Sequence, residues 1–296
     1  MSKIKSVIIL SAFALTPMAA FAQEVTSKPD FPDDADVMPA TIAPTVFDDN
    51  WIQIGIGAGY RPSYSGSDDY TFFPAPALRG SVSGFDFQAN GPGIQVDLIR
   101  DPARQKIEYL LGPAIRVRTD RNGGIKDPVV ALLGKRDVAV EVGASAGVRI
   151  NRVLIPPANL TLSIDALWDV AGAHKGNIIK PQLTFSSPLS NAAFASVSIS
   201  AEHIDRNFAR TYYSIDTAGS IASGLPTYNA KSGWKNIGSS MLVGYDLSGN
   251  GRDGGFALFG IVNYSRLVGD AKRTPITSVR GDADQWFLAG GISYTF

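Results

Sequence analysis

A strict two-residue alternation constrains the fold of this chain more than any other feature, and it is clearest in the last twelve residues, 285–296. One face of this segment carries Trp286, Leu288, Gly290, Ile292, Tyr294 and Phe296. The other face is small and largely polar. Successive side chains of a β-strand point to opposite faces, and twelve residues exceed the about 9–11 that a tilted strand needs to cross a bilayer core. The chain is therefore predicted to end in a membrane-spanning strand.

The same alternation recurs from Trp51 onward, for example in 107–118, 138–149 and 160–170. A soluble sandwich would also alternate, but its strands usually have about 5–6 residues, whereas many of these segments have eleven to fourteen. Tyr and Trp on the apolar faces also lie near strand ends, where an interfacial girdle belongs. The fold class predicted is an all-β, antiparallel transmembrane β-barrel over residues 51–296.

The strand count depends on one interruption. Direct counting gives eleven spans, and single-chain bacterial barrels use even numbers. The apolar parity changes across Asn90-Gly91-Pro92-Gly93, and a tight turn there gives twelve strands. Ten follow instead if a short rim segment has been counted as a span. The long loops, at 119–137, 205–235 and 269–284, are expected outside the cell, and the short turns in the periplasm.

Two segments precede the barrel. Residues 1–22 have Lys3 and Lys5, a short apolar run and Ala20-Phe21-Ala22, which together predict a cleaved signal peptide. Residues 23–50 are rich in Pro and Asp, so we expect an extended periplasmic tail that buries little surface. The chain has no cysteine, which excludes disulfides, thiolate metal sites and a lipoprotein anchor.

Charge restricts the partners. The chain has 27 basic and 27 acidic residues, and removal of Lys3 and Lys5 leaves 25 against 27, or −2. This balance does not predict a nucleic-acid partner. The residues expected to line the lumen are Arg79, Glu108, Arg116, Arg118, Glu141, Arg149, Asp165, Asp169, Lys180 and Glu202. Their mixed signs fit either a cross-lumen network that fills the barrel or a small polar channel, because ten or twelve strands lie between filled and open barrels.

Candidate catalytic chemistry is sparse. His174 is expected in a short external turn and His203 at the outer rim, both as polar rim residues. Nucleophilic catalysis needs a base oriented by a third group, and no such set stands out, so no catalytic, cofactor or metal residue is predicted. Asp68-Asp69 is read as a solvated turn rather than a cation site. The loop 205–235 is long enough to fold back as a plug or to reach outward as a binding surface.

Four stretches carry a family resemblance: 57–70 with 73–76, the loop 212–233, 267–271 and the terminal strand. The loop residues concerned are Tyr212, Tyr213, Ser223, Gly224, Leu225 and Tyr228. Together these stretches resemble the MltA-interacting protein MipA/OmpV family of outer-membrane proteins. Ser214 and Lys272-Arg273 depart from the family's pattern. A binding role of the family's loops is therefore less readily transferred to this chain.

The resemblance implies a non-enzymatic outer-membrane protein that needs no cofactor. Its expected role is a scaffold that links a lytic transglycosylase and a penicillin-binding protein to the outer membrane of a Gram-negative bacterium. Outer-membrane lipid, lipopolysaccharide and the barrel-insertion machinery are the other expected partners, and the insertion signal would be Trp286, Leu288, Ile292, Tyr294 and Phe296. The alternatives are a narrow channel for small polar solutes and, more remotely, an outer-membrane hydrolase.

Overall fold

A computed structural model describes residues 45–101, 105–155 and 157–296. The predicted signal peptide and residues 23–44 of the predicted tail lie outside the described residues. Among the helices that the structure describes, none is both long and apolar enough to span a membrane.

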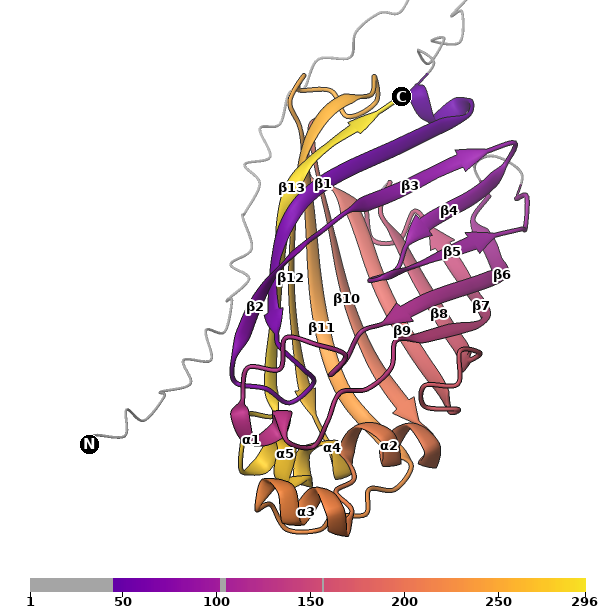
Figure 1. Ribbon diagram of the computed structural model, residues 1–296. Coiled ribbons are helices and arrows are strands. Elements are labelled where there is room, and N and C mark those ends of the chain that lie inside the picture. The colour runs from indigo at the N-terminus through magenta and orange to yellow at the C-terminus, as the bar shows by residue number, and fades with distance from the viewer. Residues whose placement is uncertain (1–44, 102–104, 156) are drawn as a thin grey trace, which may run out of the picture. The chain divides into compact units, whose positions relative to one another are not determined.

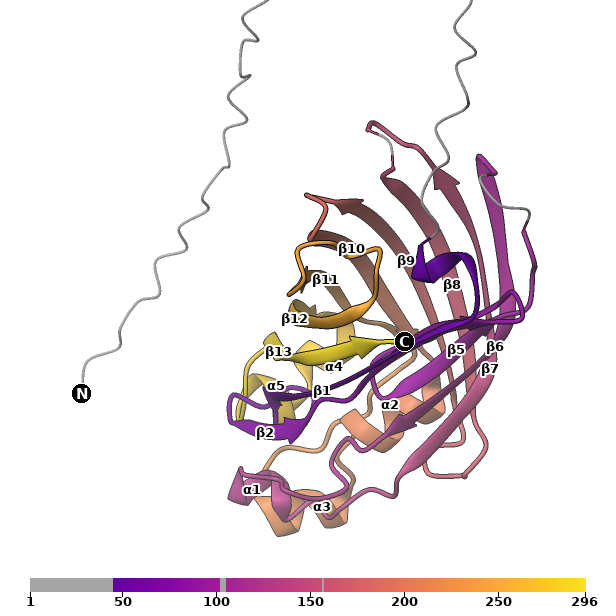
Figure 2. The same cartoon turned by 90° about the horizontal axis from the view of Figure 1, so that it is seen from above.

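Thirteen strands form a single antiparallel sheet that closes on itself, because β13 pairs with β1. Figures 1 and 2 show how the strands are arranged in this sheet. The strands are β1 (Trp51–Pro62), β2 (Tyr70–Pro74), β3 (Ala77–Val82), β4 (Phe85–Ala89), β5 (Gly93–Asp97), β6 (Ile107–Arg118), β7 (Ala139–Asn151), β8 (Asn159–Asp169), β9 (Asn177–Pro188), β10 (Ala193–Ile204), β11 (Gly233–Asp246), β12 (Gly255–Leu267) and β13 (Asp284–Thr295).

The prediction of twelve spans is confirmed. β2 and β3 pair with the same edge of β1 in one continuous register, since Ala58 faces Pro74 and Gly55 faces Ala77. They are therefore two parts of one span, and the thirteen strands make twelve spans. The turn predicted at Asn90–Gly93 separates β4 from β5, which supplies the twelfth span.

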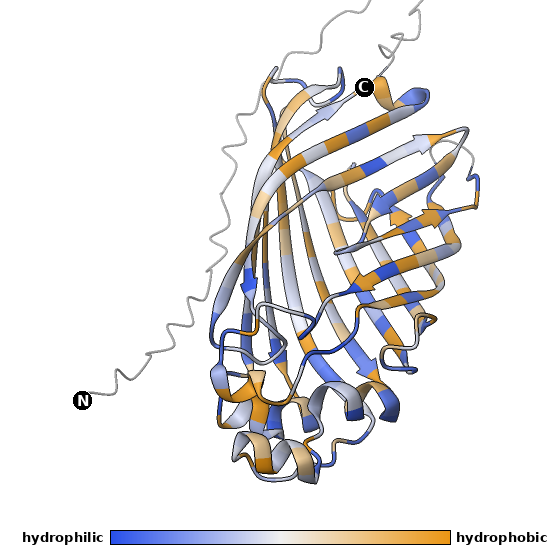
Figure 3. Cartoon of the chain, viewed as in Figure 1, coloured by the Kyte–Doolittle hydropathy of each residue, from blue (hydrophilic) through white to orange (hydrophobic). Residues whose placement is uncertain are grey.

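Alternation places each strand's apolar side chains outward. On β1 the outward residues Ile54, Ile56 and Tyr60 are exposed, whereas Gly55 and Gly59 are buried on the lumen side. Figure 3 shows apolar and polar residues alternating along the strands. Near the end of the wall at Tyr264 and Trp286, two aromatic rings pack 4.9 Å apart across β12 and β13, as expected where a barrel wall meets the lipid interface.

The two ends of the barrel differ. At one end, called here the helical end, the longer loops fold into short helices: α1 (Pro128–Ala131), α2 (Arg206–Tyr213), α3 (Thr217–Ser223), α4 (Gly269–Arg273) and α5 (Pro275–Ser278). At the other end, called here the turn end, lie the shorter connections between strands and the carboxyl terminus. The helical end is thus the end that the sequence analysis expects outside the cell.

Residues 45–50, which the sequence analysis assigned to the extended tail, are folded. Val46–Asp48 form a turn of 3-10 helix, η1. The Val46 N–H donates to the Arg252 carbonyl in the β11–β12 turn at 2.9 Å, and the Phe47 ring packs edge-on against Trp51. The tail is therefore attached to the turn end of the barrel over its last six residues.

Candidate functional site

The ten residues predicted to line the lumen share the inward face of their strands, but only some of them meet. Arg116, Arg118, Glu141 and Glu202 form a cluster of ion pairs near the helical end. Glu108 and Arg149 form a separate pair on β6 and β7, with 3.0 Å between Oε2 and Nη1. The remaining four, Arg79, Asp165, Asp169 and Lys180, have no carboxylate–cation pair among the residues that the structure describes.

The charge cluster spans the lumen. Arg116 Nε and Arg118 Nε lie 2.5 and 2.7 Å from the two oxygens of Glu141 on the neighbouring strand β7. Arg118 Nη2 also lies 3.0 Å from Glu202 Oε1, although β10 is four strands away from β6 in the sheet. Lys235 Nζ completes the cluster 2.8 Å from Glu202 Oε2. The two walls of the barrel are therefore joined by charges at this level.

Burial of the charged side chains in the lumen increases toward the helical end. The Glu141 side chain is 0% exposed, and those of Glu202 and Lys235 are 11% and 6% exposed. By contrast, the Arg149 and Glu108 side chains nearer the turn end are 31% and 20% exposed. The lumen is thus closed at the helical end and more accessible from the turn end. Ions this deeply buried need both partners, because removal of one leaves an unpaired charge that costs about 3–5 kcal/mol.

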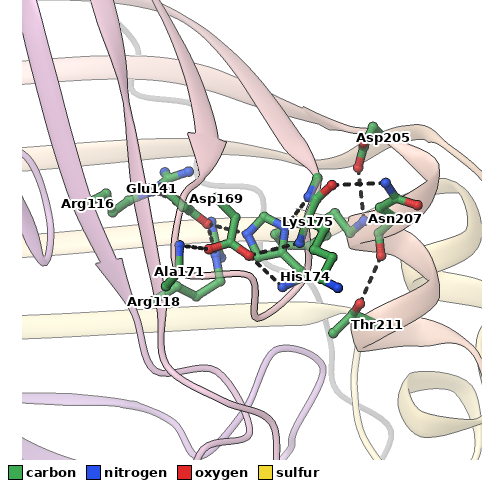
Figure 4. A network of polar contacts seen from close by, with 12 residues as sticks. Arg116, Arg118, Glu141, Asp169, Ala171, His174, Lys175, Asp205, Asn207 and Thr211 are labelled. Atoms are coloured by element: carbon green, nitrogen blue, oxygen red, sulfur yellow. Dashed lines mark hydrogen bonds and ion pairs between the residues drawn. The ribbon is translucent and has the colours of Figure 1, made fainter.

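His174 belongs to this cluster and was not expected there. A polar residue at the rim was predicted at this position, but the His174 side chain is 0% exposed. Its Nε2 lies 3.2 Å from Glu141 Oε1, and its Nδ1 accepts a hydrogen bond from the Gly176 N–H. The turn that carries it is held by Asp169, whose carboxylate accepts from the backbone N–H groups of His174 and Lys175 (Figure 4). Turn chemistry predicted an exposed residue, whereas the fold of this turn directs the ring inward.

The lid covers this cluster. We define it as residues 119–138, 205–232 and 268–283, which carry α1 to α5. The ring of Phe208 on α2 lies 4.8 Å from the Arg118 guanidinium of β6 and 5.7 Å from Lys235 Nζ of β11. It also packs edge-on against the His174 imidazole at 4.9 Å. Since β6 and β11 belong to different parts of the wall, α2 lies across the mouth of the lumen.

Local signals explain why α2 and α3 form. Asp205 accepts from the Phe208 N–H and Asp216 from the Gly219 N–H, so each helix begins with an aspartate N-cap. At the end of α3, Gly224 has φ +71° and its N–H donates to the Ser220 carbonyl. This left-handed position favours glycine. The helices that these caps begin lie in the loop 205–235, and α2 places this loop over the cluster, as expected if the loop folds back as a plug.

Of the loop residues that carry the family resemblance, Tyr212, Tyr213 and Leu225 form the interior of the lid, whereas Ser223 and Tyr228 are half-buried and Gly224 is exposed. Tyr212 and Tyr213 are each 1% exposed and Leu225 is 5% exposed. Ser223 and Gly224 end α3, and Tyr228 pairs through its backbone with Ile215. Their arrangement stabilises the lid, and burial raises the pKa of the Tyr213 hydroxyl above its ordinary range.

The stretch 57–70 of the resemblance also ends in the lid. The Ser65 hydroxyl lies 2.7 Å from the Tyr213 hydroxyl, and the Gly66 N–H donates to Gln285 Oε1 at 3.0 Å. Thr274 Oγ1 donates to the Tyr213 carbonyl at 2.7 Å. Segments far apart in the sequence are thereby joined through Tyr213.

A salt bridge fastens the lid on another side. Arg280 Nη2 lies 2.7 Å from Asp127 Oδ2, and the same carboxylate caps α1 through the Val129 and Val130 N–H groups. Burial alone would raise the pKa of Asp127, but the hydrogen bonds from Arg280 and Val130 hold it below its usual range. The Asp-Pro step at 127–128 is a helix-start signal, so this N-cap was detectable in the sequence.

Arg121 and Arg136 are further lid residues that the sequence analysis missed. Arg121 Nη1 donates to the Tyr212 carbonyl at 2.9 Å, and Arg136 Nε to the Thr211 carbonyl at 2.8 Å. Both cations therefore bind the carboxyl end of α2, where positive charge is favourable. Burial, together with the nearby Arg136, lowers the pKa of Arg121 to about 10. Nothing in the local sequence around 121 and 136 distinguishes them from solvated loop cations.

The other lumen residues lie apart from this cluster. Arg79 has its guanidinium 5.2 Å from the ring of Phe194 on β10 and donates to Gln53 Oε1 at 2.5 Å. Asp165 accepts from Asn90 Nδ2 at 3.0 Å. Lys180 lies opposite Asp165 in the strand register.

The predicted insertion-signal residues, Trp286, Leu288, Ile292, Tyr294 and Phe296, all lie on the outer face and are 37–65% exposed. His203 is also near the outer face, where it packs edge-on against Trp234 at 5.4 Å. In the described part of the chain, neither histidine is hydrogen-bonded to a serine hydroxyl. Within the same residues, no three His, Asp or Glu side chains are grouped to hold a metal ion.

Comparison with known proteins gives one family. The family model described as "MltA-interacting protein MipA" matches residues 54–296. No curated protein matches the chain.

Several solved barrels are similar in fold. An outer-membrane channel from Pseudomonas putida F1 has 9% identity and a TM-score of 0.43, with 89% of this chain and 100% of that chain covered. OprD from Pseudomonas aeruginosa has 10% identity and a TM-score of 0.35, with 82% of this chain and 65% of that one covered. The toluene transporter TodX from Pseudomonas putida has 9% identity and a TM-score of 0.36, with 84% and 89% covered. Likenesses at this level carry no inference about function.

Proposed function

The chain belongs to the MltA-interacting protein MipA family, and from this premise we propose that it is a non-enzymatic outer-membrane barrel that anchors a murein-processing enzyme at its turn end. The partner class comes from the family description, which names MltA, and MltA-type proteins are lytic transglycosylases. A penicillin-binding protein is the second partner that the family resemblance implies.

The observation that carries the proposal is the closure of the helical end. The Glu141 carboxylate and the His174 imidazole are fully buried below α2, and charges from both walls meet at Arg118 and Glu202. A polar path through the barrel would have to separate these ion pairs and move Phe208. Such closure supports a structural role better than continuous solute passage.

The turn end offers an apolar contact surface. Leu154 and Ile155 in the β7–β8 turn are 89% and 57% exposed, and Leu189 in the β9–β10 turn is 66% exposed. Leu154 also has φ +65°, a left-handed conformation that costs a non-glycine residue about 1–2 kcal/mol. Exposed apolar residues grouped at one end of a protein favour protein–protein contact. These turns would face the periplasm in the predicted orientation.

The test is direct binding of a purified MltA-type lytic transglycosylase to the refolded mature protein, with and without residues 23–44. We expect the double variant Leu154→Ser, Ile155→Ser to bind at least tenfold more weakly. Ile221→Ser is the matched control, because Ile221 is 82% exposed on α3 at the helical end. If the intact protein does not bind the enzyme, or if both variants bind as well as the intact protein, the anchoring role is wrong.

A narrow channel for small polar solutes is the second candidate. It is favoured by the greater exposure of the lumen toward the turn end, where the Arg149 and Glu108 side chains are partly accessible. Single-channel conductance in a planar bilayer separates the candidates. Steps from the full protein would support a pore, steps only after removal of 206–232 would indicate a channel gated by that loop, and silence from both would support the anchor.

A further inference from the structure

The barrel wall has a seam between β2 and the β4–β5 hairpin. β4 has only five residues, and its pairing with β3 stops at Arg79 opposite Gln88. Residues 70–77 precede this pairing and pair with β1 on one edge only. Their other edge, which faces away from β1, has no strand partner in the described chain. Figure 1 shows β2 continuing toward the helical end beyond the tip of the β4–β5 hairpin. We call the open edge 70–77 the seam.

Two prolines keep the seam unpaired. The Ala75 N–H donates to the Gly57 carbonyl at 2.9 Å, so Ala75 directs its backbone groups toward β1. In an antiparallel ladder the neighbouring residues direct theirs the other way. Pro74 and Pro76 therefore occupy positions whose N–H groups would point into the seam. Proline has no N–H, and it blunts an edge against pairing with another strand.

The seam lies within the membrane-spanning part of the wall. Pro74 is opposite Ala58 on β1, and Ala58 is opposite Gly290 on β13. Gly290 is near the middle of β13, which extends from Asp284 to Thr295. Unpaired backbone N–H groups at this depth would cost several kcal/mol each, and proline removes them. Pro74 and Pro76 thus lower the cost of leaving this edge open, although the Phe72 N–H and the carbonyls of the edge still have no strand partner in the described chain.

Both sides of the seam are apolar. Outside, the Phe72 side chain is 79% exposed. On the β1 side of β2, away from the seam edge, the outer face has an apolar hollow of about 470 Å³ that Phe72 lines together with residues of β1 and β11–β13. Inside, the rings of Phe73 and Phe287 pack 5.4 Å apart. An apolar chain passing through the seam would therefore leave lipid for an aromatic surface.

One cation lies beside this inner surface. The Arg61 guanidinium is 4.9 Å from the Phe73 ring centroid, and its Nη2 donates to Thr119 Oγ1 at 3.3 Å. It makes no ion pair with a carboxylate of the described residues. Arg61 and the two rings together fit an acidic head group followed by an apolar tail, because the guanidinium can bind the acid while the rings contact the chain.

We propose that the seam is a lateral portal through which a single-chain anionic amphiphile of the fatty-acid type enters from the bilayer and binds at Arg61, Phe73 and Phe287. The portal opens sideways into the lipid, so it does not require the lid to move. It is also independent of the turn end, where enzyme anchoring is proposed.

The test uses 11-(dansylamino)undecanoic acid as the probe and the refolded protein in phosphatidylcholine vesicles, with protein-free vesicles as background. The chain has no cysteine, so a bulky maleimide can be attached at one introduced site. We expect saturable dansyl fluorescence with the intact protein and at least a tenfold loss of affinity for labelled Pro76→Cys. Labelled Ile164→Cys is the matched control, since Ile164 is 47% exposed on the outer face of β8.

Two further comparisons keep the outcome decisive. The methyl ester of the probe should bind at least tenfold more weakly than the acid, and Arg61→Gln should remove that difference. If Pro76→Cys does not fold, as judged by the mobility shift between unheated and boiled samples, labelled Phe72→Cys replaces it. Absence of a saturable signal, or equal affinity of the seam-labelled and Ile164-labelled proteins, would overturn the portal.

Discussion

Substitution of Glu141 by glutamine is the sharpest test of the cluster that closes the barrel. Glu141 is the shared acceptor of Arg116, Arg118 and His174 and is fully buried. The amide has nearly the same size as the carboxylate, so packing below the lid is retained. The change removes the negative charge and leaves Arg116 and Arg118 with only the Glu202 carboxylate, at 3.7 and 3.0 Å, as an ion-pair partner.

The magnitude follows from burial. Loss of one partner from a buried ion pair costs about 3–5 kcal/mol, because the remaining charge is uncompensated. Glu108→Gln is the matched control, because it removes the same group from a β6–β7 pair whose side chains are 20% and 31% exposed. Solvent screens such a pair, so its loss should cost about 0–1 kcal/mol.

Urea unfolding of the refolded mature protein in detergent, followed by tryptophan fluorescence, measures both variants. With a slope of about 1–3 kcal/mol per molar urea, Glu141→Gln should lower the midpoint by about 1 M or more. Glu108→Gln should lower it much less. Equal midpoints for the two variants, or no change for Glu141→Gln, would refute the conclusion that the cluster stabilises the closed end.

Three further outcomes are expected. Asp205→Ala removes the N-cap of α2 and should cost about 0.5–2 kcal/mol, seen as faster proteolysis within the lid while the barrel remains heat-modifiable. The pKa of Asp127 is depressed in the folded protein, so its carboxylate stabilises the fold at pH values above its usual pKa of 3.8 and loses that contribution as the pH falls below 3.8. Hydrogen exchange around Arg280 should therefore rise at low pH in the intact protein. The Asp127→Asn variant should lack this pH dependence. Gly57→Ala would place a Cβ atom 2.1 Å from a backbone oxygen of β13 and should impair closure of the barrel during refolding. Gly260→Ala is the control and should refold normally, because its Cβ atom would have its nearest contact at 3.4 Å.

The wall of the barrel was readable from the sequence because strand geometry is local. A side chain's face depends only on its parity along the strand, so the outward set from Ile54 to Phe296 and the inward charges could be assigned without knowing any neighbour. The turn at Asn90–Gly93 was likewise visible as a change of parity around Gly and Pro. Twelve spans followed from that turn and from the even number that single-chain barrels use.

The lid was not readable in the same way. Asp127, Asp205 and Asp216 are local helix-start signals, but the surfaces that the helices cover belong to other loops. Tyr213 meets Ser65 and Thr274 only because the barrel brings their loops to one end. His174 is buried for the same reason, since its exposure depends on the position of Phe208.

The sequence by itself determined which residues face lipid, which face the lumen and where the chain turns, because these depend on backbone periodicity. Only the tertiary structure decided which charges meet. Arg118 reaches Glu202 across the lumen, whereas Lys180, opposite Asp165 in the register, forms no ion pair in the described chain. Such pairings depend on how the sheet closes and on how far its strands are staggered. Neither can be deduced from the sequence of a single strand.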